Sequence, residues 1–478
     1  MLLSNLIAQL GAISIDGPTD RTIDRVIHDS RNARPADVFV AIRGERVDAR
    51  RFVPDLDVAA VVADGPVSAR AGVCVIQVPN ARAALATIAA VLAGNPSEAM
   101  PVVGITGTNG KTTVTWMLES IIAHAGGTCG VIGTTGHRIG GESIPATHTT
   151  PEAPVLQELL QRMHREGCTA GLMEVSSIGI AMHRADAIPF RVAVFTSFSR
   201  DHLDFHADMD AYLAAKARLF EELLAADGIA VLNADVPACR SIDPRGRSTL
   251  TYGLSPDADV RGVNLQSTVG GTHFHITGTL GNHAIKLQLL GTHNVLNALA
   301  AFAAAHALGF TPRDIIDGLE QLSAIPGRLE LVPNDRGFHV LVDYAHTPEA
   351  LRSVLRFLRP LTQGRILCVF GCGGDRDPGK RPEMGSAADD GADWVYVTSD
   401  NPRHERPMDI IDAIVTGIAG PHTVEPDREA AISAAIQSAR PGDIILIAGK
   451  GHETTQIVGD VTSPFDDRMV ASRILEGA

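Results

Sequence analysis

The segment that most constrains this chain is a glycine-rich turn at residues 107–113, Gly-Thr-Asn-Gly-Lys-Thr-Thr. The apolar run at residues 102–105 predicts a strand before it, and apolar residues at helical spacing from Val114 to Ile122 predict a helix after it. A strand, a tight turn and a helix N-terminus direct several backbone N–H groups at one point, where they bind phosphate. The sequence therefore predicts a nucleoside triphosphate site.

Two side chains of this turn have expected roles. Lys111 would reach the terminal phosphates, and the Thr112 hydroxyl would bind magnesium. The usual spacing puts a glycine where Ile105 stands, so this is a variant phosphate loop, and a purely structural turn is the alternative. The other residues expected to contact the nucleotide are Gly107, Thr108, Asn109, Gly110 and Thr113.

Composition restricts the partners and the compartment. The net charge of −14 argues against nucleic acid as the main partner. The first 15 residues carry no basic residue and do not form a secretory signal, and the apolar stretch 295–310 is too short to cross a bilayer. We expect a monomeric cytoplasmic protein without membrane insertion, whose 6 scattered cysteines stay reduced.

The order of elements predicts an α/β protein of three domains. A small N-terminal α/β domain covers residues 1–95, with strands near 38–41, 59–63 and 74–78, a helix at 81–94 and a linker at 95–97. Strands alternating with helices predict a mostly parallel, doubly wound, P-loop-type sheet over residues 96–325, with an antiparallel ribbon at about 250–290. A second doubly wound, Rossmann-like domain covers residues 326–478.

Polar motifs follow the strands of the third domain. They lie at residues 343–346, 371–376, 399–403 and 449–453, each directly after an apolar run. Ligands of open α/β sheets bind at the carboxyl ends of strands. These four loops therefore predict a second binding site.

The central domain offers further candidate ligands. Glu174 ends a strand, and residues 200–206, Arg-Asp-His-Leu-Asp-Phe-His, follow the next one. The alternative for residues 200–206 is a solvated polar loop without a ligand. If they bind a metal, magnesium fits better than zinc, because the segment is rich in oxygen ligands and has no cysteine near it. Spacing alone places Lys216 on a helix surface.

Taken together, the motifs of this chain resemble those of the Mur ligases of bacterial peptidoglycan synthesis, over nearly the whole chain. Within that family they are most similar to the members that add the third residue of the peptide. The motifs that carry the resemblance are residues 107–113, 174–177, 200–206, 212–220, 293–297, 326–328 and 343–348, with 29–31 and 37–41 in the first domain and 373–377, 400–403 and 449–453 in the third.

The resemblance implies a reaction. ATP would phosphorylate the carboxylate of a UDP-MurNAc-dipeptide, and the amine of an amino acid would displace phosphate from the acyl phosphate. The Asp-Asn-Pro-Arg motif at residues 400–403 resembles the version that selects meso-diaminopimelate over L-lysine. Arginines of the third domain could bind the far carboxylate of diaminopimelate through two hydrogen bonds each. The alternative for Arg403 is a surface arginine that binds no ligand.

The resemblance also implies residue roles. Lys111, Lys216 and His202 would be catalytic, and Thr112, Glu174, His202 and a carbamylated Lys216 (N6-carboxylysine, formed with carbon dioxide) would hold magnesium. Asn294, Arg328 and Asp343 would bind ATP. The residues expected to bind the UDP-MurNAc-dipeptide are Ser30, Thr149, Thr150, Ser177 and Arg184. Those expected to bind diaminopimelate are Arg376, Asp400, Asn401, Pro402, Arg403, Gly449 and Glu453.

The chain departs from the family pattern at two positions, Ile178 and Ser197, where histidine and asparagine are common. Three other functions are possible from the sequence: a Mur ligase that adds a different residue, such as L-lysine, a folylpolyglutamate synthase, and a non-catalytic protein that responds to ATP. The separate N-terminal domain argues against the folate enzyme.

Overall fold

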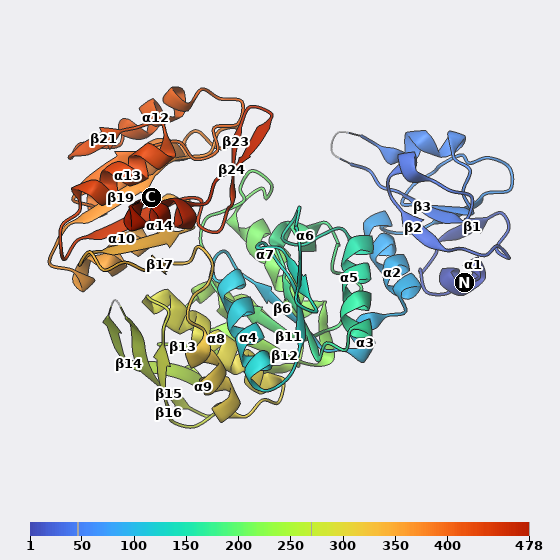
Figure 1. Cartoon of the computed structure of the whole chain (residues 1–478). Helices are drawn as coiled ribbons and strands as arrows, with labels where there is room; N and C mark the ends of the chain where they lie inside the picture. Colours follow the sequence, from blue (N-terminus) through green and yellow to red (C-terminus); the bar gives the residue numbers. More distant parts are fainter. Residues whose placement is uncertain (45–46, 269, 478) are drawn as a thin grey trace. The chain divides into compact units, whose positions relative to one another are not determined.

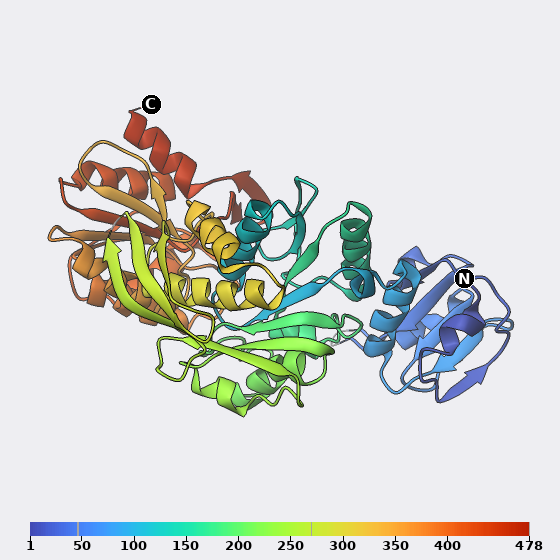
Figure 2. The same ribbon diagram turned by 90° about the horizontal axis from the view of Figure 1, so that it is seen from below.

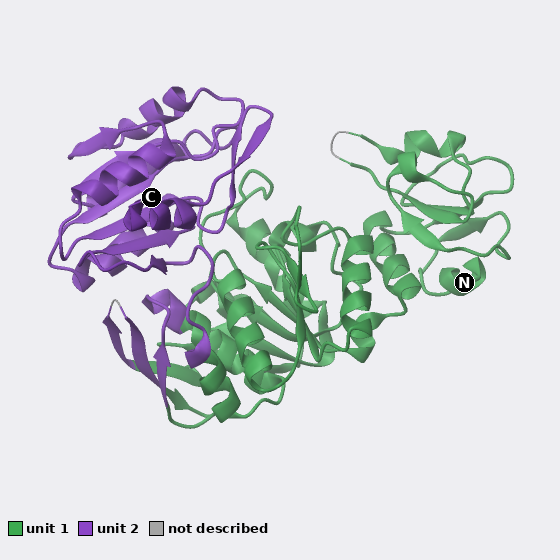
Figure 3. Cartoon of the chain, viewed as in Figure 1, with its two compact units in different colours: residues 1–263, 276–283, 296–319 green, residues 264–275, 284–295, 320–478 purple. Residues whose placement is uncertain are grey.

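The computed structural model describes residues 1–44, 47–268 and 270–477 of the chain. These residues form two compact units, residues 1–263, 276–283 and 296–319 in one and 264–275, 284–295 and 320–478 in the other (Figure 3). None of the described helices is long and apolar enough to cross a membrane. The division into three domains stays a prediction.

The first 95 residues fold around a five-stranded sheet in the order β1-β5-β4-β3-β2. Strands β2 to β5 are parallel to their neighbours, and β1 pairs antiparallel with β5. Helix α2 begins after Asn80, whose side chain accepts hydrogen bonds from the N–H groups of Arg82 and Ala83. The elements are α1 (Leu3–Ile7), β1 (Ser14–Asp16), β2 (Arg25–Ile27), η1 (Ser30–Asn32), β3 (Asp37–Ala41), η2 (Ala49–Asp55), β4 (Ala60–Ala63), β5 (Cys74–Gln77) and α2 (Ala81–Ala93).

The linker predicted at residues 95–97 is wrong. Asn95 lies in the left-handed region with φ 50°, and the short helix α3 (Pro96–Ala99) begins directly after it. Proline at the first position of a helix has its fixed φ already in the helical range and loses no hydrogen bond there. Asn-Pro at this place starts a helix instead of extending a loop.

The phosphate loop belongs to an 11-stranded sheet in the order β16-β15-β14-β13-β12-β11-β6-β10-β7-β8-β9 (Figure 1). Neighbours from β13 to β7 are parallel, and β8 and β9 add antiparallel strands at one edge. The strands are β6 (Val102–Thr106), β7 (Cys129–Ile132), β8 (His137–Ile139), β9 (Glu142–Ile144), β10 (Ala170–Glu174), β11 (Phe190–Phe195), β12 (Leu224–Asn233), β13 (Ser248–Gly253), β14 (Val260–Thr268), β15 (Gly271–Gly278) and β16 (His283–Leu287).

The ribbon predicted at 250–290 corresponds to β13 to β16, but β13 and β14 pair in parallel, so this part of the prediction is wrong. The connection between the two strands is the short segment at residues 254–259. Residue 269, within the ribbon, lies outside the described residues.

Helices lie on both sides of the central strands, as the two views show (Figures 1 and 2). Helices α5 and α7 share one buried cluster with Met173 of β10 and with Phe190, Ala193 and Phe195 of β11. Helix α4 packs its buried apolar side chains against β6, β7 and β10, outside that cluster. The helices and the 3₁₀ turn of this region are α4 (Lys111–His124), α5 (Ala153–Arg165), α6 (Ser177–Ala181), α7 (Met209–Glu221), η3 (Pro237–Ser241), α8 (Thr292–Ala307) and α9 (Pro312–Gln321).

The C-terminal region has a six-stranded sheet in the order β17-β18-β22-β19-β20-β21, parallel except for the β17–β18 pair, and a two-stranded hairpin, β23–β24. Its strands are β17 (Glu330–Val332), β18 (His339–Asp343), β19 (Ile366–Phe370), β20 (Trp394–Val397), β21 (His422–Val424), β22 (Ile444–Ala448), β23 (Thr455–Val458) and β24 (Val461–Pro464). Its helices are α10 (Pro348–Leu358), η4 (Arg359–Leu361), α11 (Lys380–Gly391), α12 (Pro407–Val415), α13 (Arg428–Ser438) and α14 (Asp467–Glu476).

Both sheets bring their predicted motifs to one edge. Glu174 pairs in register with Ile105, and Phe195 with Thr106, so the loops after β6, β10 and β11 leave the central sheet side by side. Asp343 pairs with Ala448 in the C-terminal sheet, and β19 and β20 are parallel to these strands. The 6 cysteines form no disulfide in the structure, and their reduced state in the cell stays a prediction.

Candidate active site

The turn after β6 has the predicted strand–turn–helix geometry. Gly107 and Gly110 adopt φ values of 141° and 92°, and Gly110 is the residue before the first turn of α4. A Cβ on Gly107 would lie 2.0 Å from the Thr196 hydroxyl and 2.8 Å from the Ser197 nitrogen, so only glycine fits there. The N–H groups at the start of α4 therefore lie at the turn, which is the geometry that binds phosphate.

Lys111 folds back over this turn. Its Nζ donates to the carbonyl oxygens of Gly107 at 2.8 Å and Thr108 at 2.9 Å. The turn is also fixed from the loop after β11, since the Ser197 hydroxyl accepts from the Asn109 N–H at 2.8 Å and donates to the Asn109 carbonyl at 3.0 Å. Ser197, which stands where asparagine is common in the family pattern, therefore fixes the phosphate loop through its two hydrogen bonds to Asn109.

Thr112 and Glu174 meet as predicted. The Thr112 hydroxyl donates to Glu174 Oε2 at 2.9 Å, and Glu174 also accepts from the Thr134 N–H at 3.0 Å and the Thr134 hydroxyl at 2.9 Å. Glu174 is buried, and no basic side chain pairs with it in the described structure. A buried carboxylate beside a hydroxyl is a donor set that suits magnesium.

Lys216 is buried and lies close to the same loop, contrary to what its spacing alone predicts. Its Nζ donates to the Gly107 carbonyl at 3.1 Å and lies 4.5 Å from the centre of the Tyr212 ring. Burial, and then the positive charge of Lys111, lower the pKa of Lys216 well below its ordinary value, while Asp201 opposes the shift. The side chain is therefore held as a neutral amine more readily than an exposed lysine.

His202 lies close enough to Asp201, Lys111 and Lys216 for their charges to change its pKa. It has φ 54° and is half-exposed, and burial lowers its pKa, with further lowering by Lys111 and Lys216. The second imidazole of the motif, His206, is buried and its Nε2 lies 3.0 Å from the Ser177 hydroxyl. The motif at 200–206 is therefore only partly solvated, since Arg200 and Asp204 are exposed whereas His206 is buried; its role in the site stays a prediction.

The residues predicted to bind the nucleotide-linked peptide lie beside Glu174. Thr149 contacts Thr134 at 3.0 Å between hydroxyl oxygens, and the Thr150 hydroxyl donates to the Glu174 carbonyl at 3.0 Å. Arg184 donates to the Thr150 carbonyl at 2.9 Å and pairs with Glu152 at 2.6 Å. Its Nε is buried without a hydrogen-bond partner in the described structure, which leaves a donor for a ligand. Ser30 lies apart from them in η1, which Asp29 caps.

A second group of predicted residues lies at the carboxyl edge of the C-terminal sheet. Asp343 is buried and accepts from the N–H groups of Leu329 and Ala345, both at 2.8 Å; burial raises its pKa, although Arg328 opposes this. Arg328 lies 4.8 Å from the centre of the Tyr344 ring, and its buried Nε has no hydrogen-bond partner among the described residues. Asn294, the other residue predicted to bind ATP, belongs to α8 and not to this sheet, and it donates to the Leu290 carbonyl at 2.7 Å.

The Asp400–Arg403 motif is fixed by three neighbouring segments. Arg403 Nη1 donates to the Gly374 carbonyl at 2.7 Å, and the Gly374 N–H donates to the Asn401 carbonyl at 2.9 Å. The main chain of Arg403, which has φ 50°, is bonded to Ile457 and Gly459 of the β23–β24 hairpin. Gly449 has φ 111°, and a Cβ there would lie 2.8 Å from Asp400 Oδ2.

Glu453 completes this second group. Its Oε2 accepts from Asn401 Nδ2 at 2.8 Å, which joins the loops after β20 and β22. Arg376 is exposed in the loop after β19, and Pro402 lies against Gly374. The loops of the C-terminal sheet therefore carry two arginines, two carboxylates and an amide, which suits a zwitterionic ligand.

Known protein families match both groups of loops. Residues 105–305 match the Mur ligase middle domain, and residues 327–451 match the Mur ligase glutamate ligase domain. A UDP-N-acetylmuramoyl-L-alanyl-D-glutamate–2,6-diaminopimelate ligase of Geobacter metallireducens is 42% identical over 98% of this chain and 97% of its own. The chain belongs to the Mur ligase family.

Solved structures agree with this membership. A UDP-N-acetylmuramoyl-L-alanyl-D-glutamate–2,6-diaminopimelate ligase has a TM-score of 0.75 and 32% identity, with 100% of this chain and 99% of that chain covered. A Mycobacterium tuberculosis folylpolyglutamate synthase has a TM-score of 0.66 at 21% identity, covering 82% of this chain and 95% of that one, and shows the shared fold alone. The Mur ligase resemblance found in the sequence is confirmed.

Several residues of this Mur ligase site are named in the sequence motifs, or as a departure from them, without a role in the predicted site. His206, Tyr212 and Ser197 contact predicted site residues, and Lys450 contacts both Asn401 and Glu453. Lys450 belongs to the motif at residues 449–453, but the sequence around it does not indicate which side chains it contacts. Ile178, the other departure from the family pattern, lies in α6 and is half-buried.

A histidine of the second group makes stability depend on pH. Burial, with Arg328, Arg468 and His346 nearby, lowers the pKa of His452 from 6.5 to about 4, and its ring lies 4.8 Å from that of Tyr344. Between these pH values the unfolded chain binds more protons than the folded one, so stability falls as the pH falls. Allowing for its partial exposure, we expect a loss of about 1 kcal/mol from pH 7 to pH 5.

Urea denaturation of the wild type and of His452→Gln at the two pH values measures this contribution. The variant should lose about 1 kcal/mol less than the wild type on acidification. An equal loss in both proteins would show that His452 does not contribute to the acid sensitivity.

Proposed function

We propose that this Mur ligase adds meso-2,6-diaminopimelate to UDP-MurNAc-L-Ala-D-Glu with ATP, giving UDP-MurNAc-tripeptide, ADP and phosphate. The observation that carries the proposal is the connected arrangement of Arg403, Asn401 and Glu453, in a chain 42% identical to a ligase named for this amino acid. A cytoplasmic location and a monomeric state stay predictions.

The phosphate loop supports the first half of the reaction. An oxygen of the dipeptide carboxylate attacks the terminal phosphorus of ATP, the bond from that phosphorus to the bridging oxygen breaks, and ADP leaves. Both reactants are anions, so cations must offset their repulsion. In this proposal Lys111 and the N–H groups of residues 107–113 bind the phosphates, while Asn294, Arg328 and Asp343 bind the nucleoside side of ATP.

The donor set beside the loop suits magnesium. Thr112 and Glu174 would hold one ion, which would supply positive charge to the phosphate oxygens. His202 and Lys216 would hold a second ion if Lys216 carries a carbamate. That modification fits the buried amine, since a neutral nitrogen attacks carbon dioxide, a C–N bond forms, and a proton leaves the nitrogen.

The C-terminal loops support the second half. The amine of diaminopimelate attacks the acyl carbon, phosphate leaves with the carbon–oxygen bond electrons, and a proton leaves the amine. Arg403 and Arg376 would bind the far carboxylate, and Glu453 and the Gly449 carbonyl would accept from the far ammonium. L-lysine lacks the far carboxylate and would leave an arginine unpaired.

Ser30, Thr149, Thr150, Ser177 and Arg184 would bind the UDP-MurNAc-dipeptide. The buried unpartnered Nε of Arg184 supports this role, because such a donor is expected to find a ligand acceptor. Under the same proposal residues 1–95 bind the uridine nucleotide, 96–325 bind ATP, and 326–478 bind the incoming amino acid.

Mass spectrometry of the product tests the proposal. Purified protein receives UDP-MurNAc-L-Ala-D-Glu, ATP, magnesium and equal amounts of diaminopimelate and L-lysine. We expect the diaminopimelate tripeptide, and phosphate release that needs all the substrates. A lysine product would favour the L-lysine-adding alternative, and ATP hydrolysis without a longer peptide would contradict ligation.

A further inference from the structure

A buried lysine connects the loops of the proposed amino-acid site. Lys450 follows β22 and is fully buried, with 0% of its surface exposed. Its Nζ donates to Asn401 Oδ1 at 3.2 Å, to Glu453 Oε2 at 3.1 Å and to the Thr455 carbonyl at 2.7 Å. An ammonium has three N–H donors, so these bonds use all of them and leave none for a ligand.

The bonds of Lys450 fix two side chains that are proposed to face the ligand. Asn401 Oδ1 accepts from Lys450 and from the Ile457 N–H at 3.0 Å, and this orients its amide so that Nδ2 donates to Glu453 Oε2 at 2.8 Å. Glu453 Oε2 thus accepts twice, while Oε1 accepts no hydrogen bond within the described part of the chain. One carboxylate oxygen is fixed and the other is left for an ammonium.

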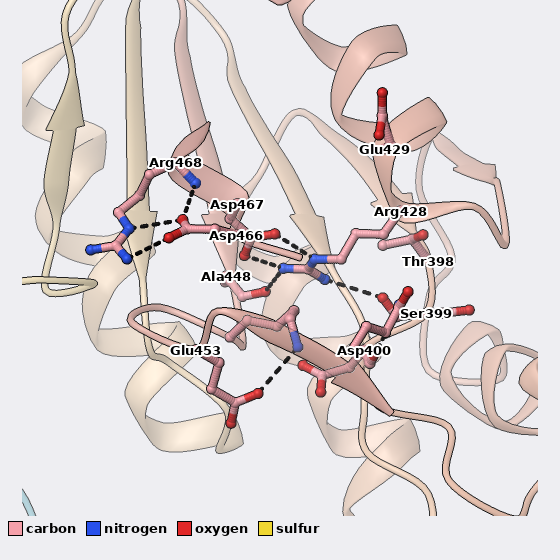
Figure 4. A network of polar contacts seen from close by, with 12 residues as sticks. Thr398, Ser399, Asp400, Arg428, Glu429, Ala448, Glu453, Asp466, Asp467 and Arg468 are labelled. Atoms are coloured by element: carbon pink, nitrogen blue, oxygen red, sulfur yellow. Dashed lines mark hydrogen bonds and ion pairs between the residues drawn. The ribbon is translucent and has the colours of Figure 1, made fainter. Parts of the chain in front are cut away.

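The strand ends beneath these loops are held by a different cation. Arg428 begins α13 and pairs with Asp467, which begins α14, through Nε and Nη2, both at 2.7 Å (Figure 4). Its guanidinium also donates to the Ala448 carbonyl at 2.9 Å and the Ser399 carbonyl at 3.3 Å, at the ends of β22 and β20. Because Arg428 holds the strand ends, a change at Lys450 should affect the loops above them and leave the sheet intact.

We propose that Lys450 is a positioning residue for the incoming amino acid, acting through Asn401 and Glu453; this inference rests on the proposed function. Charge-assisted hydrogen bonds in a buried setting are stronger than neutral ones, and they set the geometry of their acceptors. Without the ammonium, the Glu453 carboxylate keeps only its bond from Asn401 and turns toward solvent. The far ammonium of diaminopimelate then loses a correctly oriented acceptor.

Steady-state kinetics of Lys450→Met test this role, since methionine fills much of the same volume without a charge. We expect the KM for diaminopimelate to rise roughly ten- to a hundredfold, because one charged hydrogen-bond network is lost. The KM values for ATP and for UDP-MurNAc-dipeptide should stay within about twofold, because Lys450 donates to Asn401, Glu453 and the Thr455 carbonyl and to none of the side chains proposed to bind those two substrates. Lys286→Met, at an exposed lysine of β16, is the matched control and should change none of the three.

A double-mutant cycle separates positioning from general stabilisation. If Lys450 acts through Glu453, Lys450→Met should have little further effect on the diaminopimelate KM in a Glu453→Gln background. An unchanged KM in the single variant, additive effects in the cycle, or an equal rise in all three KM values with loss of cooperative melting would each overturn the proposal. Wild-type protein that ligates no diaminopimelate would instead contradict the proposed function.

Discussion

Lys216→Ala is expected to lower the ligation rate roughly a hundred- to a thousandfold, the usual effect of removing one group that stabilises charge at a reacting centre. Lys216 Nζ lies 3.1 Å from the Gly107 carbonyl, at the start of the phosphate loop. The amine therefore lies beside the phosphate loop, and a carbamate at this place would hold a magnesium ion whose charge offsets that of the phosphates. Binding of UDP-MurNAc-dipeptide, measured by calorimetry, should be unchanged.

The carbamate itself has a separate signature. Carbon dioxide reacts with the neutral amine only, and burial and Lys111 lower the pKa of Lys216, so the neutral fraction at neutral pH is larger than for an exposed lysine. This fraction falls as the pH falls through the lowered pKa. Activity should therefore decrease on acidification and on removal of carbon dioxide, and ¹³C-labelled carbon dioxide should give a carbamate resonance that Lys216→Ala lacks.

Lys286→Ala serves as the control because it removes an exposed lysine from β16. It should leave the rate and the resonance unchanged. Full ligation by Lys216→Ala would show that this residue has no role in the mechanism. If Lys216→Ala is slow but the wild type gives no carbamate resonance, the lysine is needed and the modification is not.

The elements that sequence could predict are those with a local signal. The strand, turn and helix at residues 102–124 follow from an apolar run, two glycines and helical periodicity, and the structure has them as β6 and α4. The buried parallel strands β18, β19, β20 and β22 were likewise predicted, because strands covered on both faces are almost continuous apolar runs.

Short edge elements could not be predicted in the same way. β17 and β21 have 3 residues each, and the β23–β24 hairpin is mostly exposed, so their sequences carry little apolar pattern. The hairpin nevertheless holds the main chain of Arg403. A part of the candidate site thus depends on an element with no clear local signal.

The burial of individual cations depends on tertiary packing. Lys216 occupies a helix position that spacing alone assigns to the surface, but α7 packs so that its Nζ meets a carbonyl 109 residues earlier in the chain. Arg428 pairs with an aspartate 39 residues away, and Lys450 meets an asparagine 49 residues away. Such pairs follow from the arrangement of the strands, and no local sequence pattern shows them.

Arg403→Ala is expected to lower kcat/KM for diaminopimelate roughly a hundredfold or more, since it removes a charged hydrogen-bond donor from the proposed carboxylate site. The loop itself should persist, because the main chain of Arg403 is bonded to Ile457 and Gly459 independently of its side chain. Among the described residues, the side-chain hydrogen bond that the unliganded protein loses is the 2.7 Å bond from Nη1 to the Gly374 carbonyl. The effect should therefore be on the amino acid and not on ATP, whose KM should stay within about twofold.

Two further variants make the test specific. Arg406→Ala removes an exposed arginine whose nearest carboxylate is 3.9 Å away, and it should leave kcat/KM for diaminopimelate unchanged. Arg403→Lys keeps the charge but loses the planar fork, so it should restore only part of the activity. If the far carboxylate is what Arg403 reads, turnover of L-lysine should change much less than turnover of diaminopimelate in Arg403→Ala. Near wild-type use of diaminopimelate by that variant would show that selection of the amino acid lies in other residues of the C-terminal loops.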